Sequence, residues 1–437
     1  MTLGAFLPDI FSYSLPLAHT CKPLYIGYMA IRDTFTAFRH RNFKILFTVS
    51  FFTNVGTWSQ RVAQDWLVLQ LSGSGRELGL VTALQFFPTL LLSLVGGLLA
   101  DRFSKRKLLM ITNFGSGISA GILGALVLNN SVQMWHVYVL ALTLGIFSAI
   151  DAPIRQSFTS EVVGKTDLAN AVSLNSANFN LGRLVGPGLA GLSIAAFGTG
   201  PSFLVNAASY LIVIGGLLAL RESDLHLQKR EEIRATLKDA FQYVRQHNQI
   251  LALMIVVFFG ATFGLNFQIF NALMATSEFH KGPAQFGALG STLAIGSLTG
   301  ALLTARLPKG RTPRRIMGFA ILFGSALFGI SFAPTYLAYC VVLPIAGALA
   351  ITTMVSSNSY VQTNTEPRMR GRVMGIYLTV FMGGTPIGAP IVGYLSTAFG
   401  IRDTMRLCGL ITVIATLSAM TFLKRRQEIV ESSPATL

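Results

Sequence analysis

Long apolar segments recur along this sequence and limit the folds that it can adopt. From Phe43 to Leu423 most of these segments are about 20 residues long, enough for a helix to cross the roughly 30 Å hydrocarbon core of a bilayer. Only 12% of the residues are charged, about half of the share found in soluble domains. The sequence therefore predicts an all-α protein embedded in the lipid bilayer. The twelve predicted transmembrane helices are residues 43–70, 78–100, 108–128, 135–156, 167–197, 202–220, 250–276, 284–306, 316–333, 335–357, 373–399 and 404–423.

Lysine and arginine residues are distributed unequally between the two sides of the predicted spans. The two tails, the even-numbered loops and the span ends next to them contain 28 of the 34, whereas the opposite side has only Arg76, Lys281, Arg402 and Arg406. This bias follows the positive-inside rule and predicts that both termini are cytoplasmic. Membrane topology thus accounts for the net charge of +16, and no nucleic-acid partner is predicted.

The N-terminal 28 residues do not resemble a targeting segment. They lack the basic region that begins a secretory signal peptide. The arginine-rich stretch RDTFTAFRHRNFK follows Met29. This pattern favours Met29 as the start of the protein, and the alternative is a genuine extension that lies at the membrane interface.

The two halves of the sequence resemble each other at an offset of 202 residues. GRLVGPGLAGLSIAAFG, at residues 182–198, then aligns with GTPIGAPIVGYLSTAFG, at 384–400. Six spans followed by six related spans indicate a parallel duplication, which in transporters places the substrate site between the halves. The predicted regions are a cytoplasmic segment at 1–42, six-helix bundles at 43–220 and 250–423, an amphipathic cytoplasmic linker at 221–249 and a cytoplasmic tail at 424–437.

Several functional classes lack the residues that they require. Cys21, Cys340 and Cys408 are odd in number and the six histidines are scattered, so no metal site, disulfide or cofactor is predicted. No G-x-x-x-x-G-K-[ST] motif is present to support direct use of ATP. A membrane enzyme would need clustered His, Asp or Glu residues, and a sensor would need an added soluble domain. The sequence predicts neither class.

The loop after the second predicted span carries the most specific motif. GGLLADRFSKRK, from Gly96 to Lys107, contains a glycine, an aspartate four residues later, an arginine and a basic cluster. This pattern resembles the motif of the major facilitator superfamily, with Ser104 in place of the usual glycine. The stretches DWLVLQLSGS, IDAPIRQSF, NFNLGRLVGPGLAG and RMRGRV resemble the branch of bacterial siderophore (enterobactin) and macrolide exporters. The matching positions of the loop are Gly97, Asp101, Arg102, Lys105 and Arg106.

The resemblance implies a cytoplasmic gate at this loop. In the family the aspartate, here Asp101, meets the start of the eleventh span, near Arg372 and Val373. A following cation, here Lys105, pairs with an acid at the base of the fourth span, here Asp151, with Arg155 one turn further along. The alternative is a basic cluster that only anchors the topology.

The fifth predicted span combines glycines with a proline. Gly182, Gly186, Pro187 and Gly191 match the Gly-Pro-rich fifth span of exporters. Pro187 cannot donate a hydrogen bond to the Arg183 carbonyl, so a bend is expected. Glycines four apart let another backbone approach closely. The resemblance implies packing against span eight, which supplies Gly287, Gly290, Gly296 and Gly300, or else ordinary helix packing.

Three charged residues lie well inside the spans, away from their ends, where a charge is costly and requires a partner. Arg61 and Asp65 are four residues apart on one helical face, and Arg183 is a second possible partner for Asp65. We expect Asp65 to carry protons by exchanging between a cation and water. The alternatives are a permanent ion pair, or Asp151 as the carrier.

The resemblance also implies that spans one, four, seven and ten line a central cavity. An apolar cavity with a few amides suits an amphipathic organic compound. The sequence thus predicts a monomeric secondary transporter of the bacterial cytoplasmic membrane, which exports a siderophore, drug or metabolite by proton antiport. The alternatives are a proton symporter and a lysolipid flippase. The predicted lining residues are Asn54, Trp58, Gln60, Gln64, Asn266, Gln268 and Asn271.

Overall fold

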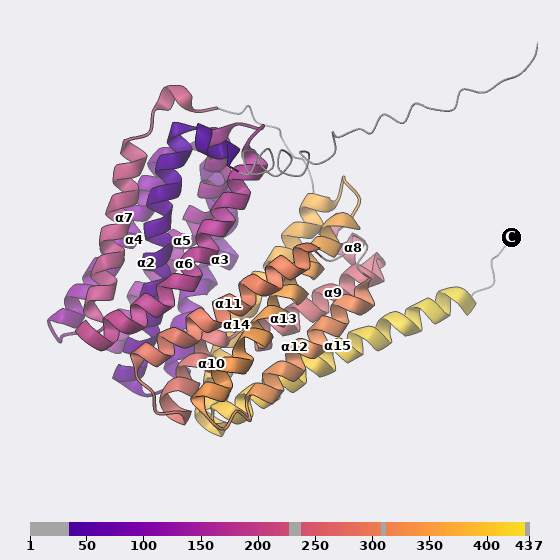
Figure 1. The fold of residues 1–437 in the computed structure, drawn as a ribbon. Coiled ribbons are helices and arrows are strands. Elements are labelled where there is room, and N and C mark those ends of the chain that lie inside the picture. The colour runs from indigo at the N-terminus through magenta and orange to yellow at the C-terminus, as the bar shows by residue number, and fades with distance from the viewer. Residues whose placement is uncertain (1–34, 227–236, 307–311, 433–437) are drawn as a thin grey trace, which may run out of the picture.

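The computed structural model describes residues 35–226, 237–306 and 312–432, and these residues form helices joined by short loops (Figure 1). The predicted all-α class is confirmed. We call the helices before the linker the N-terminal half. Its elements are η1 (Thr36–Arg39), α2 (Arg41–Ser72), α3 (Gly75–Arg102), α4 (Lys105–Leu128), α5 (Met134–Val163), α6 (Leu168–Phe197) and α7 (Gly200–Leu218), followed by η2 (Glu222–Asp224).

The helices after the linker form the C-terminal half, which α8 (Leu237–Gln246) precedes. Its elements are α9 (Asn248–Phe259), η3 (Gly260–Gly264), α10 (Phe267–Leu273), η4 (Met274–Glu278), α11 (Pro283–Arg306), α12 (Pro313–Ile330), α13 (Tyr336–Thr363), α14 (Arg370–Phe399) and α15 (Ile401–Ser432).

Length and hydropathy qualify nine helices of the described residues as membrane spans, or ten with α3, which is bent by 52°. The long helices α2 and α6 do not meet the same hydropathy criterion. These two helices carry Arg61, Asp65 and Arg183. The two helices that are not apolar enough to meet the criterion are therefore the ones that carry the intramembrane charges. The count of twelve spans stays a prediction.

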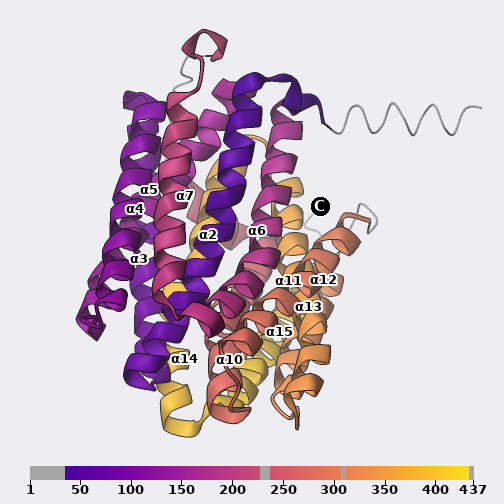
Figure 2. The same cartoon turned by 60° about the vertical axis from the view of Figure 1, so that its left-hand side comes forward.

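The two halves are joined near one end and diverge toward the other. In Figures 1 and 2 the helices of each half run alongside one another, and α6 and α11 cross between the halves. The principal contacts between halves are α6 with α11 and α3 with α14. We call the end near Gly79 and Gly191, where these contacts lie, the sealed end. The opposite end, near Lys105 and Arg372, is the basic end.

The predicted span at 250–276 is one apolar stretch but not one regular helix. α9 ends in the π-turn η3, and a break at Leu265 and Asn266 precedes α10, which ends in the second π-turn η4. The Asn266 side chain donates a 2.7 Å hydrogen bond to the Thr262 carbonyl beside the break. π-turns are frequent at functional sites, and this break positions Gln268 at the start of α10.

The described part of the linker forms the amphipathic helix α8, which packs against α14. Ala240, Tyr243 and Val244 are buried, whereas Phe241 is exposed. Arg372 of α14 lies 3.5 Å from Asp239. The expectation about Met29 and the N-terminal extension lies outside the described residues.

Candidate functional site

Small residues let α6 and α11 meet at the sealed end. A Cβ atom at Gly191 would lie only 3.0 Å from the Gly287 Cα, and one at Gly290 would lie 2.7 Å from the Pro187 Cβ. The Ser291 hydroxyl donates a 2.7 Å hydrogen bond to the Leu184 carbonyl, in the turn that precedes the proline. The expected contact between spans five and eight is therefore present, and it includes a polar bond between the halves.

The other glycines expected at this contact face different neighbours. Gly182 packs against Asn54, and Gly186 packs against Val55 and Trp58, all on α2 of the same half. The reason is geometric, because residues 182, 186 and 191 do not share one narrow face of a helix. The expectation that Gly182 and Gly186 face the C-terminal half is wrong.

The same correction applies to two glycines of α11. Gly296 and Gly300 pack against Pro344 and Ala348 of α13, within the C-terminal half. These two glycines therefore contribute to packing within the C-terminal half rather than to the contact with α6.

A second contact between the halves brings α3 against α14. A Cβ atom at Gly79 would lie 3.1 Å from the Gly393 Cα, so these helices also meet at backbone distance. The Arg76 amide donates a 3.0 Å hydrogen bond to the Thr397 hydroxyl. The Gly79–Gly393 contact and the Gly191–Gly287 contact thus both lie at the sealed end.

A buried carboxyl group bridges the halves at the sealed end. Asp65 of α2 is only 1% exposed, and its Oδ1 accepts a 2.7 Å hydrogen bond from the Gln268 amide of α10. Asp65 ends up beside α10 because the helical break orients the first turn of that helix toward α2. The interaction disappears if the two halves separate at this end.

The predicted cation partners of Asp65 are not bound to it. Among the described residues, neither Arg61 nor Arg183 forms an ion pair within 4.0 Å of a carboxylate. Both guanidinium groups instead lie near the Trp58 ring, at 4.7 Å and 5.7 Å from its centre. The Asp65–Arg61 and Asp65–Arg183 pairs expected from the sequence are therefore wrong for this conformation.

A cavity of about 550 Å³ lies inside the N-terminal half, toward the basic end. Its lining comes from α2, α4, α5, α6 and α7. Hydroxyl and amide groups alternate with apolar side chains on these walls, as is usual for sites that bind organic molecules. The polar lining residues include Thr53, Asn54, Thr57, Asn113, Ser148, Asp151, Arg155, Asn175, Asn178 and Tyr210.

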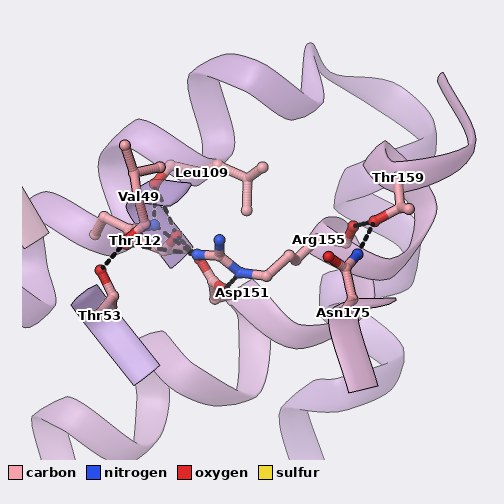
Figure 3. Close-up of polar contacts among 9 residues, drawn as sticks. Val49, Thr53, Leu109, Thr112, Asp151, Arg155, Thr159 and Asn175 are labelled. Carbon is pink, nitrogen blue, oxygen red and sulfur yellow. Dashed lines mark hydrogen bonds and ion pairs between the residues drawn. The ribbon is translucent and has the colours of Figure 1, made fainter. Parts of the chain in front are cut away.

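Asp151 and Arg155 form the charged part of the cavity wall (Figure 3). The guanidinium donates to both carboxylate oxygens, with Nε 2.8 Å from Oδ2 and Nη2 3.2 Å from Oδ1. Thr112 and Asn113 of α4 donate to Oδ1 at 2.7 Å and 3.0 Å. Four donors thus hold this carboxylate in place, and its charge is compensated within the protein.

Most of the amides predicted to line a cavity are buried and bonded to protein partners. Gln60 accepts a hydrogen bond from Asn206, Gln64 donates to Gln85, and Asn271 accepts from Tyr339. A polar group inside a membrane helix finds a partner wherever one is available. Asn54 does line the cavity. Trp58, Gln60, Gln64, Asn266, Gln268 and Asn271 do not belong to its lining. The central cavity that we expect them to line from the sequence stays a prediction.

The pairing predicted for the basic loop differs from the one observed. Lys105 forms an ion pair with Glu161, at the end of α5, while Asp151 is occupied by Arg155. Ten residues of helix separate the two acids, about 15 Å, so Lys105 reaches the one nearer the basic end. The expected Lys105–Asp151 pair is wrong.

Neighbouring residues of the loop are also anchored. Arg106 donates to the Leu217 and Leu218 carbonyls at the end of α7, and it pairs with Glu222. Gly97 and Asp101 line a surface hollow with Pro153, whereas the close packing of α3 on Pro153 occurs at Gly96. Arg102 is exposed.

A double-mutant cycle on Lys105 tests the corrected pairing. Lys105→Gln and Glu161→Gln should each lower the midpoint of thermal unfolding, and the double variant should lose little more than either one. Coupling of about 0.5–3 kcal/mol is typical of residues in direct contact. The matched cycle of Lys105→Gln with Asp151→Asn should be additive, and coupling there instead would restore the original expectation.

Several residues of the site escaped sequence reasoning. Glu161, Thr112, Asn113 and Tyr210 are ordinary polar residues near helix ends or among small residues. The i, i+4 spacing of Asp151 and Arg155 was the available indication of their pair. The spacing of Thr112 and Asn113 on α4 gives no hint of the α5 carboxylate that they bind.

The fold, the duplicated halves and the intramembrane charges define a multi-pass membrane transporter. Residues 32–436 match the family model described as transmembrane secretion effector, and the chain belongs to this family of the major facilitator superfamily. It is 26% identical to the staphyloferrin A transporter of Staphylococcus aureus, over 88% of this chain and 97% of that protein. It is 28% identical to the multidrug efflux pump Tap of Mycolicibacterium fortuitum (84% and 92% covered), and 24% identical to the enterobactin exporter EntS of Salmonella paratyphi A (90% and 95%).

Solved transporter structures share the fold. The nucleoside transporter NupG superimposes with a TM-score of 0.72 at 14% identity, over 88% of this chain and 99% of that one. A bacterial homologue of the lysosomal transporter Spinster, in an inward-facing and unoccupied conformation, gives a TM-score of 0.68 at 16% identity, with 88% and 97% covered. The chain is therefore a transporter rather than an enzyme, as predicted.

Proposed function

We propose that this protein exports an amphipathic organic compound from a bacterial cell by alternating access, coupled to proton entry. The exporters and the efflux pump among its relatives support the direction and the kind of substrate. The protein is then a monomer with twelve spans in the cytoplasmic membrane, and its basic end and both termini are cytoplasmic. Its working parts are the bundles at 43–220 and 250–423, joined by the linker at 221–249.

In this proposal the structure corresponds to the inward-facing state. The halves meet at the sealed, extracellular end and diverge at the basic end, and the cavity lies toward the basic end. Closing the basic end brings Asp101, with Gly97 and Arg102, toward the start of α14. A carboxylate there can accept from the free N–H groups of the helix N-terminus. The loop thus acts as a latch in the outward-facing state.

The observation that carries proton coupling is the hydrogen bond between Asp65 and Gln268 across the seal. An ionised carboxylate buried without a cation costs free energy, whereas a protonated one can remain buried and hydrogen-bonded. A proton taken up from outside therefore favours closure of the seal, and loss of the proton favours its opening. Substrate leaves when the seal opens, so export and proton entry alternate.

Everted vesicles containing the protein test this proposal. With an acidic lumen, exported compounds enter the vesicle as protons leave, so a pH-sensitive dye should regain fluorescence when a compound is added. The compounds are a panel of siderophores and amphipathic drugs, and the control is vesicles that lack the protein. Accumulation of a compound with no dye response would contradict antiport.

Two other activities on the same fold give different results in these vesicles. A proton symporter moves compound and proton together, so a compound added outside would not collapse the acid gradient. A lysolipid flippase would move a labelled lysophospholipid between leaflets without responding to the panel. Either result would replace the proposed function.

A further inference from the structure

Two arginines near the middle of the N-terminal half have no protein partner for their charge. In the described chain, neither the Arg61 nor the Arg183 guanidinium forms an ion pair or a hydrogen bond, and the Arg61 Nε is fully buried. Arg402, by contrast, pairs with Glu278 and donates to two carbonyls. Charges inside a membrane protein are usually paired, so this site has an excess of positive charge.

The two arginines flank one aromatic ring. The Cζ atoms of Arg61 and Arg183 lie 4.7 Å and 5.7 Å from the centre of the Trp58 ring, and Arg61 is also 5.1 Å from the Phe86 ring. Both of the Trp58 distances are measured to the same ring centre. The two Cζ atoms are therefore no further apart than the sum of these two distances. Cation–π contacts stabilise each group only modestly, and the two cations repel one another.

The arginines lie next to the inner end of the cavity. Thr57 and Phe179 line that cavity, and Arg61 and Arg183 follow them by one helical turn on α2 and α6. The Trp58 and Phe179 rings meet edge to face at 5.6 Å between them. This aromatic contact therefore lies at the boundary between the cavity lining and the two arginines.

We propose that Arg61, Arg183 and Trp58 form the inner end of the substrate site and bind the carboxylate of an aromatic or other planar organic acid. The negative charge of the ligand acts as the counter-charge for the two arginines, and its ring packs against Trp58 and Phe179. Arginine binds carboxylates through paired N–H donors. The inference rests on the proposed function for its biological meaning, and it defines the exported compound as an organic anion.

Asp65 lies on the same helix as Arg61 but is held by Gln268 at the seal. The anion therefore binds without competing for that hydrogen bond. Asp151 is equally unavailable to the two arginines, because Arg155, Thr112 and Asn113 occupy it. Neither carboxylate thus forms an ion pair within 4.0 Å of the two arginines in the described chain, and the ligand supplies a negative charge in direct contact with them.

Three small probes of the same ring size test the inference on the full-length protein in detergent. Benzoate is anionic, benzamide is neutral and benzylamine is cationic. Binding is followed by the emission of Trp58 in a Trp66→Phe, Trp135→Phe background and by the thermal unfolding midpoint at constant ionic strength. We expect a saturable response to benzoate and none at equal concentration to the other two.

Variants assign the response to the two arginines. Arg61→Gln and Arg183→Gln should each weaken benzoate binding by roughly 10- to 100-fold, while Arg61→Lys retains part of it. Arg76→Gln removes a positive charge at the sealed end and should change nothing. An equal response to benzamide or benzylamine, no response to benzoate in folded protein, or unchanged binding in the Arg61→Gln, Arg183→Gln double variant would each overturn the inference.

Binding and transport fail separately in these experiments. Benzoate binding that depends on both arginines, in a protein that exchanges no protons in vesicles, supports the anion site and contradicts the proposed export mechanism. Proton exchange driven by cationic compounds, with no benzoate binding, supports the proposed export mechanism and contradicts the anion site.

Discussion

Replacing Asp65 with asparagine is expected to abolish export driven by a pH gradient while leaving the fold intact. Asparagine has the size of a protonated aspartic acid, and its carbonyl can still accept the hydrogen bond from Gln268. It cannot lose a proton, so the step that favours opening of the seal is removed. For a one-for-one exchange with no membrane potential, a gradient of one pH unit sustains a roughly tenfold ratio of compound across the membrane. The variant should show a ratio of about one.

Two control variants distinguish the loss of proton coupling from a general loss of structure. Asp403→Asn removes an exposed carboxylate at the same end of the molecule and should leave the ratio unchanged. Gln268→Leu removes the hydrogen bond but keeps the carboxylate, so coupling should persist with a less stable seal. If Asp65→Asn transports as the wild type does, Asp65 is not the carrier and Asp151 is the next residue to replace.

A leucine at Gly191 is expected to keep the sealed end open. The helices α6 and α11 meet there at backbone distance, with 3.0 Å between a Cβ at Gly191 and the Gly287 Cα. Overpacking a close contact costs about 1–3 kcal/mol. Because the contact exists only in the sealed state, this cost should lower the population of that state by roughly 5- to 150-fold, and export should fall accordingly.

Cysteine labelling from outside the cell measures this change. A cysteine at Ser291, in a background without Cys21, Cys340 and Cys408, should react faster with a membrane-impermeant maleimide when Gly191 is leucine. Gly215→Leu is the matched control, because a Cβ at Gly215 of α7 meets no atom within 4 Å. Equal labelling in the Gly191→Leu variant and the control would show that the α6–α11 contact does not govern the seal.

The sequence predicts the helical class and the contact between spans five and eight, because apolar length and glycine spacing are local properties. It does not predict the partners of particular side chains. Two π-turns interrupt the span that contains Gln268, and each turn rotates the residues after it relative to an α-helical count. No 3.6-residue periodicity could therefore place Gln268 beside Asp65.

The predictions about individual site residues were wrong where several partners are available to one side chain. Gln60 and Asn271 are residues of the kind that lines a polar cavity. Inside the helix bundle, however, they accept hydrogen bonds from Asn206 and Tyr339. Lys105 had two acids on α5 as possible partners, and the position of the start of α4 beside the end of α5 selects Glu161. Such choices depend on distances between helices, which a single sequence does not encode in any local pattern.

The two halves, which align with each other at an offset of 202 residues, differ in character at one pair of positions. At the offset of 202 residues, Asp151 and Arg155 correspond to Thr353 and Ser357, which are fully buried and joined by a hydrogen bond from the Ser357 hydroxyl to the Thr353 carbonyl. One copy thus keeps a charged pair against a hollow, and the other has a neutral pair in solid packing at the equivalent turn. In the proposed transport cycle the substrate therefore meets charged side chains at this turn of the N-terminal half, and a neutral, filled turn at the corresponding place in the C-terminal half.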